Sequence, residues 1–430
     1  MQLNRAFAQQ LIDTALKSGA QDAEVYQSSS FSRPVTFESN RLKQLESSES
    51  VGTALRVWRD GRPGLAVAYG AVEPQSLVDK AIALSDLNGI NRPDFCEPRR
   101  DINPPIGKEL SVETFIEMGK TAIAQLREAY PDLVCHSSFE CDHSETLLLN
   151  SDQLYCEAAD ISLSFFLGAE WMRGDDFLAV YDSEVAQDKL QTAEIVQSIL
   201  QRLQWATQNT RPSSGKIPVL FTSNAASMLW STVSSALNGK FILEGSSPWS
   251  HAGGKQVLSP KISLYQDPTA KPYICHFDDE GTPTRALSLI REGEIQDFYG
   301  DRHTSKALRL RPTGNGFRPS LGRYPTPDLI NLIVAPGEKQ PLEIIADLEN
   351  AIIVDQILGG GADLSGDFSV NIDLGYQVKN GEVIGRVKDT MVSGNVYEAL
   401  KHVVEIGGDR RWQGSCLTPS ILLESLSITG

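Results

Sequence analysis

Residue types that could activate water for hydrolysis are sparse in this chain. A zinc peptidase helix usually carries two histidines one turn apart, with a glutamate beside them as the general base. Only six histidines are present, and no two of them are three or four residues apart. The chain also lacks a G-x-S-x-G nucleophile elbow, a G-x-x-x-x-G-K-[ST] phosphate loop and a C-x-x-C pair. The easily recognised catalytic classes are therefore not supported by the residues alone.

Four potential metal ligands gather within residues 135–143, namely Cys135, His136, Cys141 and His143. Neighbouring side chains of a strand point to opposite faces of the sheet, and this spacing matches no common zinc ribbon. We therefore expect these four residues to occupy ordinary sheet positions.

An acidic segment follows His276, where Asp278, Asp279 and Glu280 precede Gly281. Three carboxylates in a row could bind a cation, but aspartate and glycine also favour tight turns. A turn is the favoured interpretation.

A glycine-rich segment covers residues 359–367 and could suggest a phosphate cradle. Residues 368–372 alternate like a strand, however, whereas a phosphate cradle usually opens into a helix. We therefore expect a loop that lets the backbone approach a peptide or a partner closely.

The composition is that of an ordinary globular protein of 430 residues, 41% of them hydrophobic. Lys and Arg number 39 against 55 Asp and Glu, and the resulting formal charge of -16 argues against nucleic-acid binding. Six irregularly spaced cysteines favour reduced thiols. No run approaches the roughly 20 apolar residues of a membrane helix, and the first residues do not resemble a signal peptide. We expect a cytoplasmic protein without membrane contact.

Hydrophobic periodicity predicts an α+β fold in two parts. In the N-terminal part, 1–208, the order helix, strands, helix occurs over 1–88 and again over 111–208, which favours an internal duplication. A polar segment rich in Pro, Gly and Ser, 209–216, is the predicted linker. The remainder, 217–430, is predicted to be β-rich, with helices at 225–237 and 396–406. The predicted strands include 42–46 in the first block and 133–140, 146–150, 161–167 and 177–181 in the second.

Several segments of the second half resemble motifs of the TldD/PmbA family. The matching segments are Leu364-Ser365-Gly366-Asp367-Phe368-Ser369, Gly375 to Glu382, Phe277-Asp278-Asp279-Glu280-Gly281, Ile290 to Glu294, Ser393-Gly394-Asn395, Ile406 to Asp409, and Thr418-Pro419-Ser420. Each motif is weak alone, and the set is specific. The resemblance covers residues 217–430, whereas the N-terminal half matches mainly in its pattern.

The resemblance implies an N-terminal α+β domain and a C-terminal β-rich domain that assemble as a dimer around an internal chamber. In the family, TldD-type subunits carry an H-E-x-x-x-H zinc helix and a later cysteine. They act with TldE-type partners on short or unfolded peptides, including leader-peptide removal. Aligned with that helix, this chain has Trp230 and Ser235 in place of the histidines and Ser231 in place of the glutamate. Trp and Ser are not usual zinc ligands, so the chain resembles the TldE (PmbA) branch, and Cys416 is interpreted as a buried or coincidental thiol.

The leading hypothesis is a metal-free, TldE-like subunit of a TldD/TldE-type metallopeptidase, with zinc expected only in a TldD-type partner. The chain would form a heterodimer with that partner or a homodimer, and would bind short or unfolded peptides. Two alternatives remain: a stand-alone homodimeric metallopeptidase with a different metal near Asp278 to Glu280, Asp301 or His303, and a regulatory or adaptor protein of the gyrase-modulator type. The candidate peptide-binding residues are Gly361, Ser365, Gly366, Asp367, Ser369 and His303.

Overall fold

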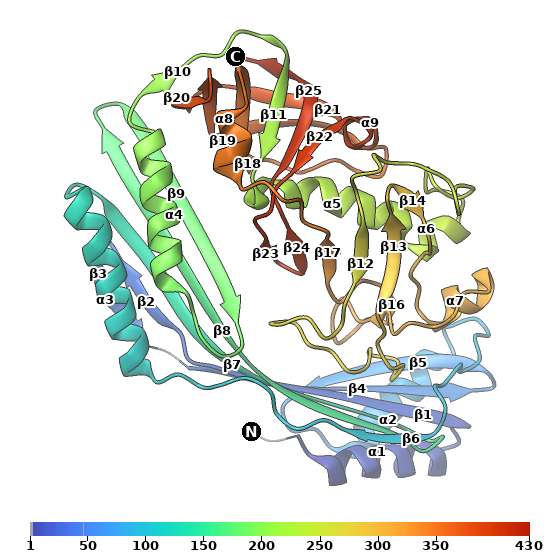
Figure 1. Cartoon of the computed structure of the whole chain (residues 1–430). Coiled ribbons are helices and arrows are strands. Elements are labelled where there is room, and N and C mark those ends of the chain that lie inside the picture. The colour runs from blue at the N-terminus through green and yellow to red at the C-terminus, as the bar shows by residue number, and fades with distance from the viewer. Residues whose placement is uncertain (1–2, 46) are drawn as a thin grey trace.

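The computed structural model describes residues 3–45 and 47–430, and one large sheet organises the N-terminal half (Figure 1). Its described strands follow the order β3-β2-β7-β1-β4-β5, with β8 paired to β7 and to β6, and β9 paired to β8. Their bounds are β1 Asp22–Ser32, β2 Val35–Glu38, β3 Arg41–Leu45, β4 Ser48–Arg59, β5 Arg62–Tyr69, β6 Arg99–Ile102, β7 Val134–Asn150, β8 Leu154–Arg173 and β9 Asp176–Ala186. Because β1 pairs with β7, the strands of both predicted blocks belong to one sheet. The internal duplication stays a prediction.

Four helices cover this sheet in two pairs, at opposite ends of the long strands β7 and β8 (Figure 1). The first pair, α1 (Arg5–Lys17) and α2 (Pro74–Ser85), buries its apolar face against β1, β4 and β5. The second pair, α3 (Val112–Ala129) and α4 (Thr192–Trp205), packs on β7, β8 and β9. The Ser111 side chain caps α3 by accepting a hydrogen bond from the Thr114 amide.

No helix within the described ranges 3–45 and 47–430 is both long and apolar enough to span a membrane. Even α3, with 18 residues, carries Glu113, Glu117, Lys120 and Arg127 along its length.

The predicted strands 133–140 and 146–150 are a single strand, β7, so their separation was wrong. The polar residues between them stay in the ladder because strands on both sides hold them: His143 lies opposite Phe31 of β1 and opposite Ile161 of β8. Tertiary pairing thus overrides weak local strand propensity. The predicted strand 42–46 corresponds to β3, except that residue 46 lies outside the described residues.

Two larger sheets and a short hairpin form the C-terminal half. The first sheet has the order β10-β20-β19-β18-β11-β25-β21, with β22 on β25, and a further β19–β21 pairing closes it on itself. The second has the order β14-β13-β12-β17-β24-β23, and β15 pairs with β16. The strand bounds are β10 Asn209–Thr210, β11 Gly215–Phe221, β12 Leu264–Gln266, β13 Leu287–Arg291, β14 Glu294–Ile295, β15 Gly316–Phe317, β16 Thr326–Pro327, β17 Leu332–Val334, β18 Asn350–Leu358, β19 Asp367–Lys379, β20 Glu382–Val387, β21 Met391–Asn395, β22 Val403–Ile406, β23 Arg411–Gln413, β24 Cys416–Thr418 and β25 Ile421–Thr429.

The helices of this half are α5 (Ser223–Leu237), α6 (Gly239–Leu243), α7 (Arg302–Leu308), α8 (Pro341–Ala346) and α9 (Val396–Lys401). The α+β class with a β-rich second half is confirmed, as is the helix predicted at 225–237. The helix predicted over 396–406 was wrong in its last part. It ends at Lys401, and β22 then pairs with β25, where Val403 lies opposite Leu423. The β-branched Val403 suits that pairing.

The segment 209–216 is only partly irregular. Asn209 and Thr210 form β10, which pairs in parallel with β20, and Gly215 begins β11. Division of the chain at this segment therefore stays a prediction.

A buried arginine joins the two halves. Arg202 of α4 is 4% exposed and lies between Asp182 of β9, at 2.7 Å, and Asp355 of β18, at 3.0 Å. Asp355 also accepts hydrogen bonds from Thr222 (2.9 Å) and Asn224 (3.2 Å) at the start of α5. One apolar core surrounds this network and contains residues of α3, α4, β7, β8 and β9 together with residues of β18 and β19. The halves thus share a core as well as an ion-pair network.

We expect replacement of Arg202 with methionine to lower the free energy of unfolding by about 3–5 kcal/mol, because Asp182 and Asp355 would keep buried charges without their common partner. Lys120→Met is the control, since Lys120 pairs with Glu117 on the exposed surface, and its loss should cost less than about 0.5 kcal/mol. Urea denaturation of both variants measures the difference. Equal midpoints for the two variants would refute a dominant role for Arg202.

Candidate functional site

Helix α5 forms one wall of a cavity because its two faces differ in chemistry. Its sequence consists mainly of small and apolar residues, and Leu229, Trp230 and Val233 are fully buried in the C-terminal core. The opposite face carries Ser227, Ser231 and Ser234 at helical spacing, and all three line the cavity. Trp230 therefore belongs to the core.

This α5 cavity has a volume of about 510 Å³. Besides the three serines, it is lined by the apolar residues Met228, Trp230, Leu329, Leu332 and Ile357, by Asp328, by Gly361, and by Gln413 to Cys416 of the β23–β24 hairpin. Gln413 donates a 2.8 Å hydrogen bond to Asn224, which bonds Asp355 in turn. The buried ion-pair network therefore fixes one polar wall of the cavity.

The residues that align with the zinc helix do not form a metal site. The Trp230 indole donates a 2.7 Å hydrogen bond to Thr418 inside the core. Ser231 donates to the Met228 carbonyl at 2.8 Å, and Ser235 donates to the Ser231 carbonyl at 2.9 Å. Ser231 lines the cavity, whereas Ser235 lies outside its lining. These hydroxyls are bonded to the helix backbone, and none is a usual zinc ligand.

The remaining donors of the α5 cavity do not complete a zinc site either. Burial raises the pKa of the Cys416 thiol to about 12, which disfavours the thiolate that zinc requires. Burial also raises the pKa of Asp328. Within residues 3–45 and 47–430, no group of three or more His, Cys, Asp and Glu side chains is placed to hold a metal ion. The residues of this cavity therefore do not fit the zinc chemistry of a two-histidine helix.

The structure places one of the predicted peptide-binding residues, Gly361, at the α5 cavity. Gly366 is buried with φ +85°, and a Cβ there would lie 2.6 Å from the Tyr397 ring, so a local structural requirement explains this glycine. Asp367 accepts a 2.9 Å hydrogen bond from Asn395, which also bonds the Ser365 carbonyl at 3.0 Å. These contacts hold the loop at the start of β19. Further along β19, Ser369 is exposed opposite Ser393 of β21.

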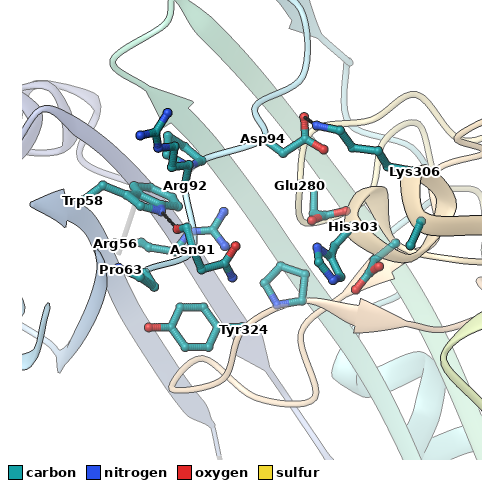
Figure 2. A pocket seen from close by; sticks show the side chains of 14 residues that line it. Arg56, Trp58, Pro63, Asn91, Arg92, Asp94, Glu280, His303, Lys306 and Tyr324 are labelled. Atoms are coloured by element: carbon teal, nitrogen blue, oxygen red, sulfur yellow. Dashed lines mark hydrogen bonds and ion pairs between the residues drawn. The ribbon is translucent and has the colours of Figure 1, made fainter. Parts of the chain in front are cut away.

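His303 lies in a different cavity, of about 630 Å³, between the two halves of the chain (Figure 2). Figure 2 shows His303 and Glu280 on one wall, opposite Arg56, Asn91 and Trp58 on the other. We call this the interdomain cavity. It shares no lining residue with the α5 cavity, so the structure separates His303 from Gly361.

The acidic segment after His276 is a turn, as predicted, and its carboxylates bond the main chain. Asp278 accepts hydrogen bonds from the amides of Glu280 (3.0 Å), Thr282 (2.8 Å) and Gly316 (2.8 Å). Glu280 accepts one from the Arg302 amide at 2.8 Å. Burial, together with the Asp278 charge, raises the pKa of Glu280. The turn is a structural device that keeps the carboxyl groups of Asp278, Asp279 and Glu280 in desolvated positions, where burial raises the pKa of each.

The cysteines and histidines of 135–143 occupy ordinary sheet positions, as predicted. Cys135, Cys141 and His143 lie on one face of β7, where His143 is 3.8 Å from the Cys141 sulfur and 3.9 Å from Glu109. His136 lies on the other face, 3.6 Å from Glu170.

Sequence reasoning missed several residues of the α5 cavity, above all Asp328 and Gln413. These residues are brought to α5 by the C-terminal sheets and have no local motif. The serine spacing of α5 was a signal that could have been used, since Ser227, Ser231 and Ser234 mark one helix face.

Comparison with known proteins gives matches over nearly the whole chain. A family model described as the PmbA/TldA metallopeptidase C-terminal domain matches residues 214–430, and the model for PmbA/TldA metallopeptidase domain 1 matches residues 23–85. A protein named metalloprotease from Methanothermobacter thermautotrophicus is 23% identical over 415 residues, which cover 90% of this chain and 88% of that protein. Metalloprotease PmbA from Escherichia coli O157:H7 is 23% identical over 454 residues, covering 100% and 98%. The crystal structure of TldE from Thermococcus kodakarensis superposes with a TM-score of 0.91 at 24% identity, covering 99% of this chain and 100% of TldE. At this identity the superposition shows a shared fold.

We expect Glu280→Gln to weaken the pH dependence of stability. An unfolded glutamate titrates near pH 4.3 or so, whereas the folded pKa of Glu280 is raised, so the folded state binds more protons above that pH. Its contribution to stability must therefore fall as pH rises from about 5 to 9. Urea denaturation over this range should show that the wild type loses on the order of 1–3 kcal/mol more than Glu280→Gln. Parallel pH curves for the two proteins would contradict this, and Glu117→Gln on the exposed face of α3 is the matched control.

Proposed function

Because the chain belongs to the PmbA/TldA metallopeptidase family, we propose that it is a TldE-like, metal-free subunit that binds short or unfolded peptides. A TldD-type partner would supply the zinc site. The observation that carries this proposal is the lining of the α5 cavity, in which the helix presents Ser227, Ser231 and Ser234 and its tryptophan is buried in the core. Helix α5 contains no Asp, Glu or His, so it offers no carboxylate or imidazole that could act as general base.

The α5 cavity suits a peptide segment. Its volume of about 510 Å³ lies within the range of roughly 300–1,000 Å³ that is usual for ligand sites. Apolar side chains such as Leu329 and Ile357 would cover the body of a peptide, and the Gln413 amide and the serine hydroxyls would bond its main chain. Backbone pairing with a strand edge would add affinity without strict sequence choice. Gly361 at the rim leaves room for an approaching backbone.

The other proposed properties follow from the family and from the charge of the chain. We propose a heterodimer with a TldD-type subunit, or a homodimer in its absence, in the cytoplasm. The formal charge of -16 disfavours direct contact with nucleic acid. A stand-alone metallopeptidase that uses Asp278 to Glu280 is less well supported, because Asp278 and Glu280 already bond main-chain amides.

We expect no metal-dependent hydrolysis of unfolded peptides by the purified chain alone. A mixture with a purified TldD-type subunit should hydrolyse them. Metal-activated hydrolysis needs a bound ion and a base, and the α5 positions offer Trp230, Ser231 and Ser235. Two measurements test this expectation. They are metal analysis of the isolated chain and a fluorogenic peptide assay of each component and of the mixture. Chelator-sensitive hydrolysis by this chain after rigorous removal of the partner would overturn the proposal.

We expect Gly361→Leu to reduce peptide hydrolysis by the mixture at least about tenfold, because the new side chain would enter the α5 cavity beside Met228. Gly360→Leu is the matched control, since a Cβ at Gly360 meets open space and Gly360 does not line the cavity. The rate at subsaturating peptide concentration measures the effect, and circular dichroism checks the fold. Equal rates for the two variants would show that the α5 cavity takes no part in peptide binding.

A further inference from the structure

The interdomain cavity is a second enclosed space that the proposed peptide groove does not use. One wall comes from β4, β5 and the segment 91–94 of the N-terminal half. The other wall comes from the acidic turn, α7 and the residues Tyr324 and Pro325 of the C-terminal half (Figure 2). Ligand sites are frequent at such boundaries, and the volume of about 630 Å³ would accept a small organic molecule.

Arg56 is the most constrained cation of this cavity. Its guanidinium lies 4.7 Å from the Trp58 ring centroid and 5.9 Å from that of Tyr324. It bonds Glu24 at 2.9 Å, and Glu24 also bonds Arg318 at 2.9 Å, so two guanidinium groups share one carboxylate. The Nε atom of Arg56 is buried and has no hydrogen-bond partner among the described residues. Glu24 and the two aromatic rings therefore fix the position of the Arg56 guanidinium at this wall.

The carboxyl groups of the cavity are engaged or held neutral. Asp94 lies 3.6 Å from Arg302 and 3.7 Å from Lys306, and Asp301 accepts a 2.7 Å hydrogen bond from the Thr304 amide. The raised pKa of Glu280 favours its protonated form, which can donate a hydrogen bond.

Two further side chains of the lining are not engaged. The Arg92 guanidinium and the His303 imidazole form no hydrogen bond or ion pair with other side chains in the part of the chain that the structure describes. In a protein with a formal charge of -16, the lining thus holds as many Arg and Lys side chains (Arg56, Arg92, Lys306) as carboxyl groups (Asp94, Glu280, Asp301).

The chemistry of the walls favours a carboxylate over a phosphate. Phosphate sites usually offer several free main-chain amides at a helix start or a glycine-rich turn. Here the amides at the start of α7 are occupied, because the Arg302 amide bonds Glu280 and the Thr304 amide bonds Asp301. A guanidinium beside aromatic faces instead matches a planar carboxylate that is attached to a flat apolar body.

We propose that the interdomain cavity binds a small carboxylate whose apolar body packs on Trp58 and Tyr324 while its carboxyl group bonds Arg56 and His303. The carboxylate could belong to a free organic acid or to the C-terminal end of a short peptide, and both present the same group. This site shares no lining residue with the α5 cavity.

Isothermal titration calorimetry of the full chain with N-acetylphenylalanine and with its C-terminal amide tests the proposal. We expect the acid to bind and the amide to bind at least about tenfold more weakly, because the amide lacks the charged group that pairs with Arg56. A tripeptide with a free C-terminus, compared with its amidated form, separates the two sources of the carboxylate. Equal binding of acid and amide, no binding of either, or displacement of the acid by inorganic phosphate would overturn the proposal.

Substitutions locate the site. His303→Ala and Tyr324→Ala should each weaken binding of N-acetylphenylalanine several-fold, and Arg56→Met should weaken it at least about tenfold. Arg59→Met is the matched control, because Arg59 is exposed at the end of the same strand and does not line the cavity.

The test does not depend on Arg56→Met alone. Arg318 continues to pair with Glu24 in that variant, and if the variant still fails to fold, His303→Ala and Tyr324→Ala decide the question. Unchanged affinity in these two variants would refute the site. Gly361→Leu should leave this binding intact, so failure here is distinguishable from failure of the peptide-binding function.

Discussion

The buried pairing of Arg202 with Asp182 and Asp355 is the interaction on which the relation between the two halves depends. It places α4 and β9 of the N-terminal half against β18 of the C-terminal half, inside a shared apolar core. Asp355 then bonds Thr222 and Asn224, so the same network sets where α5 begins. A buried charge that lacked its partners would cost several kcal/mol, which makes this arrangement hard to rearrange.

The consequences of that network reach the α5 cavity. Asn224 accepts a hydrogen bond from Gln413, which lines the cavity, and α5 supplies the serine face opposite. The shape of the cavity thus depends on ion pairs made outside it. Its polarity comes from both sides, since the serines of α5 face Asp328 and Gln413.

The two cavities are joined by one short stretch of chain. Tyr324 and Pro325 line the interdomain cavity, and Asp328 and Leu329 line the α5 cavity. Between them, β16 pairs with β15, whose first residue, Gly316, bonds the acidic turn through Asp278. The acidic turn therefore positions one wall of the interdomain cavity and the chain segment that leads to the α5 cavity. Its glycine neighbours matter for packing, since a Cβ at Gly316 would lie 2.3 Å from Glu280.

The sequence by itself determined the α+β class, the elements with strong periodicity such as α3 and α5, the burial of Trp230, and the absence of a two-histidine motif, because these depend on local residue order. Only the tertiary structure decided that the polar middle of β7 stays in the sheet, that residues 403–406 leave the predicted helix to pair with β25, and that His303 and Gly361 line different cavities. It also decided that Asp328 and Gln413 meet α5, and that Arg56 faces Glu280 across the interdomain cavity. The physical reason is that strand pairing, buried ion pairs and cavities are formed by residues far apart in the chain. Their partners therefore leave no local pattern of spacing or propensity.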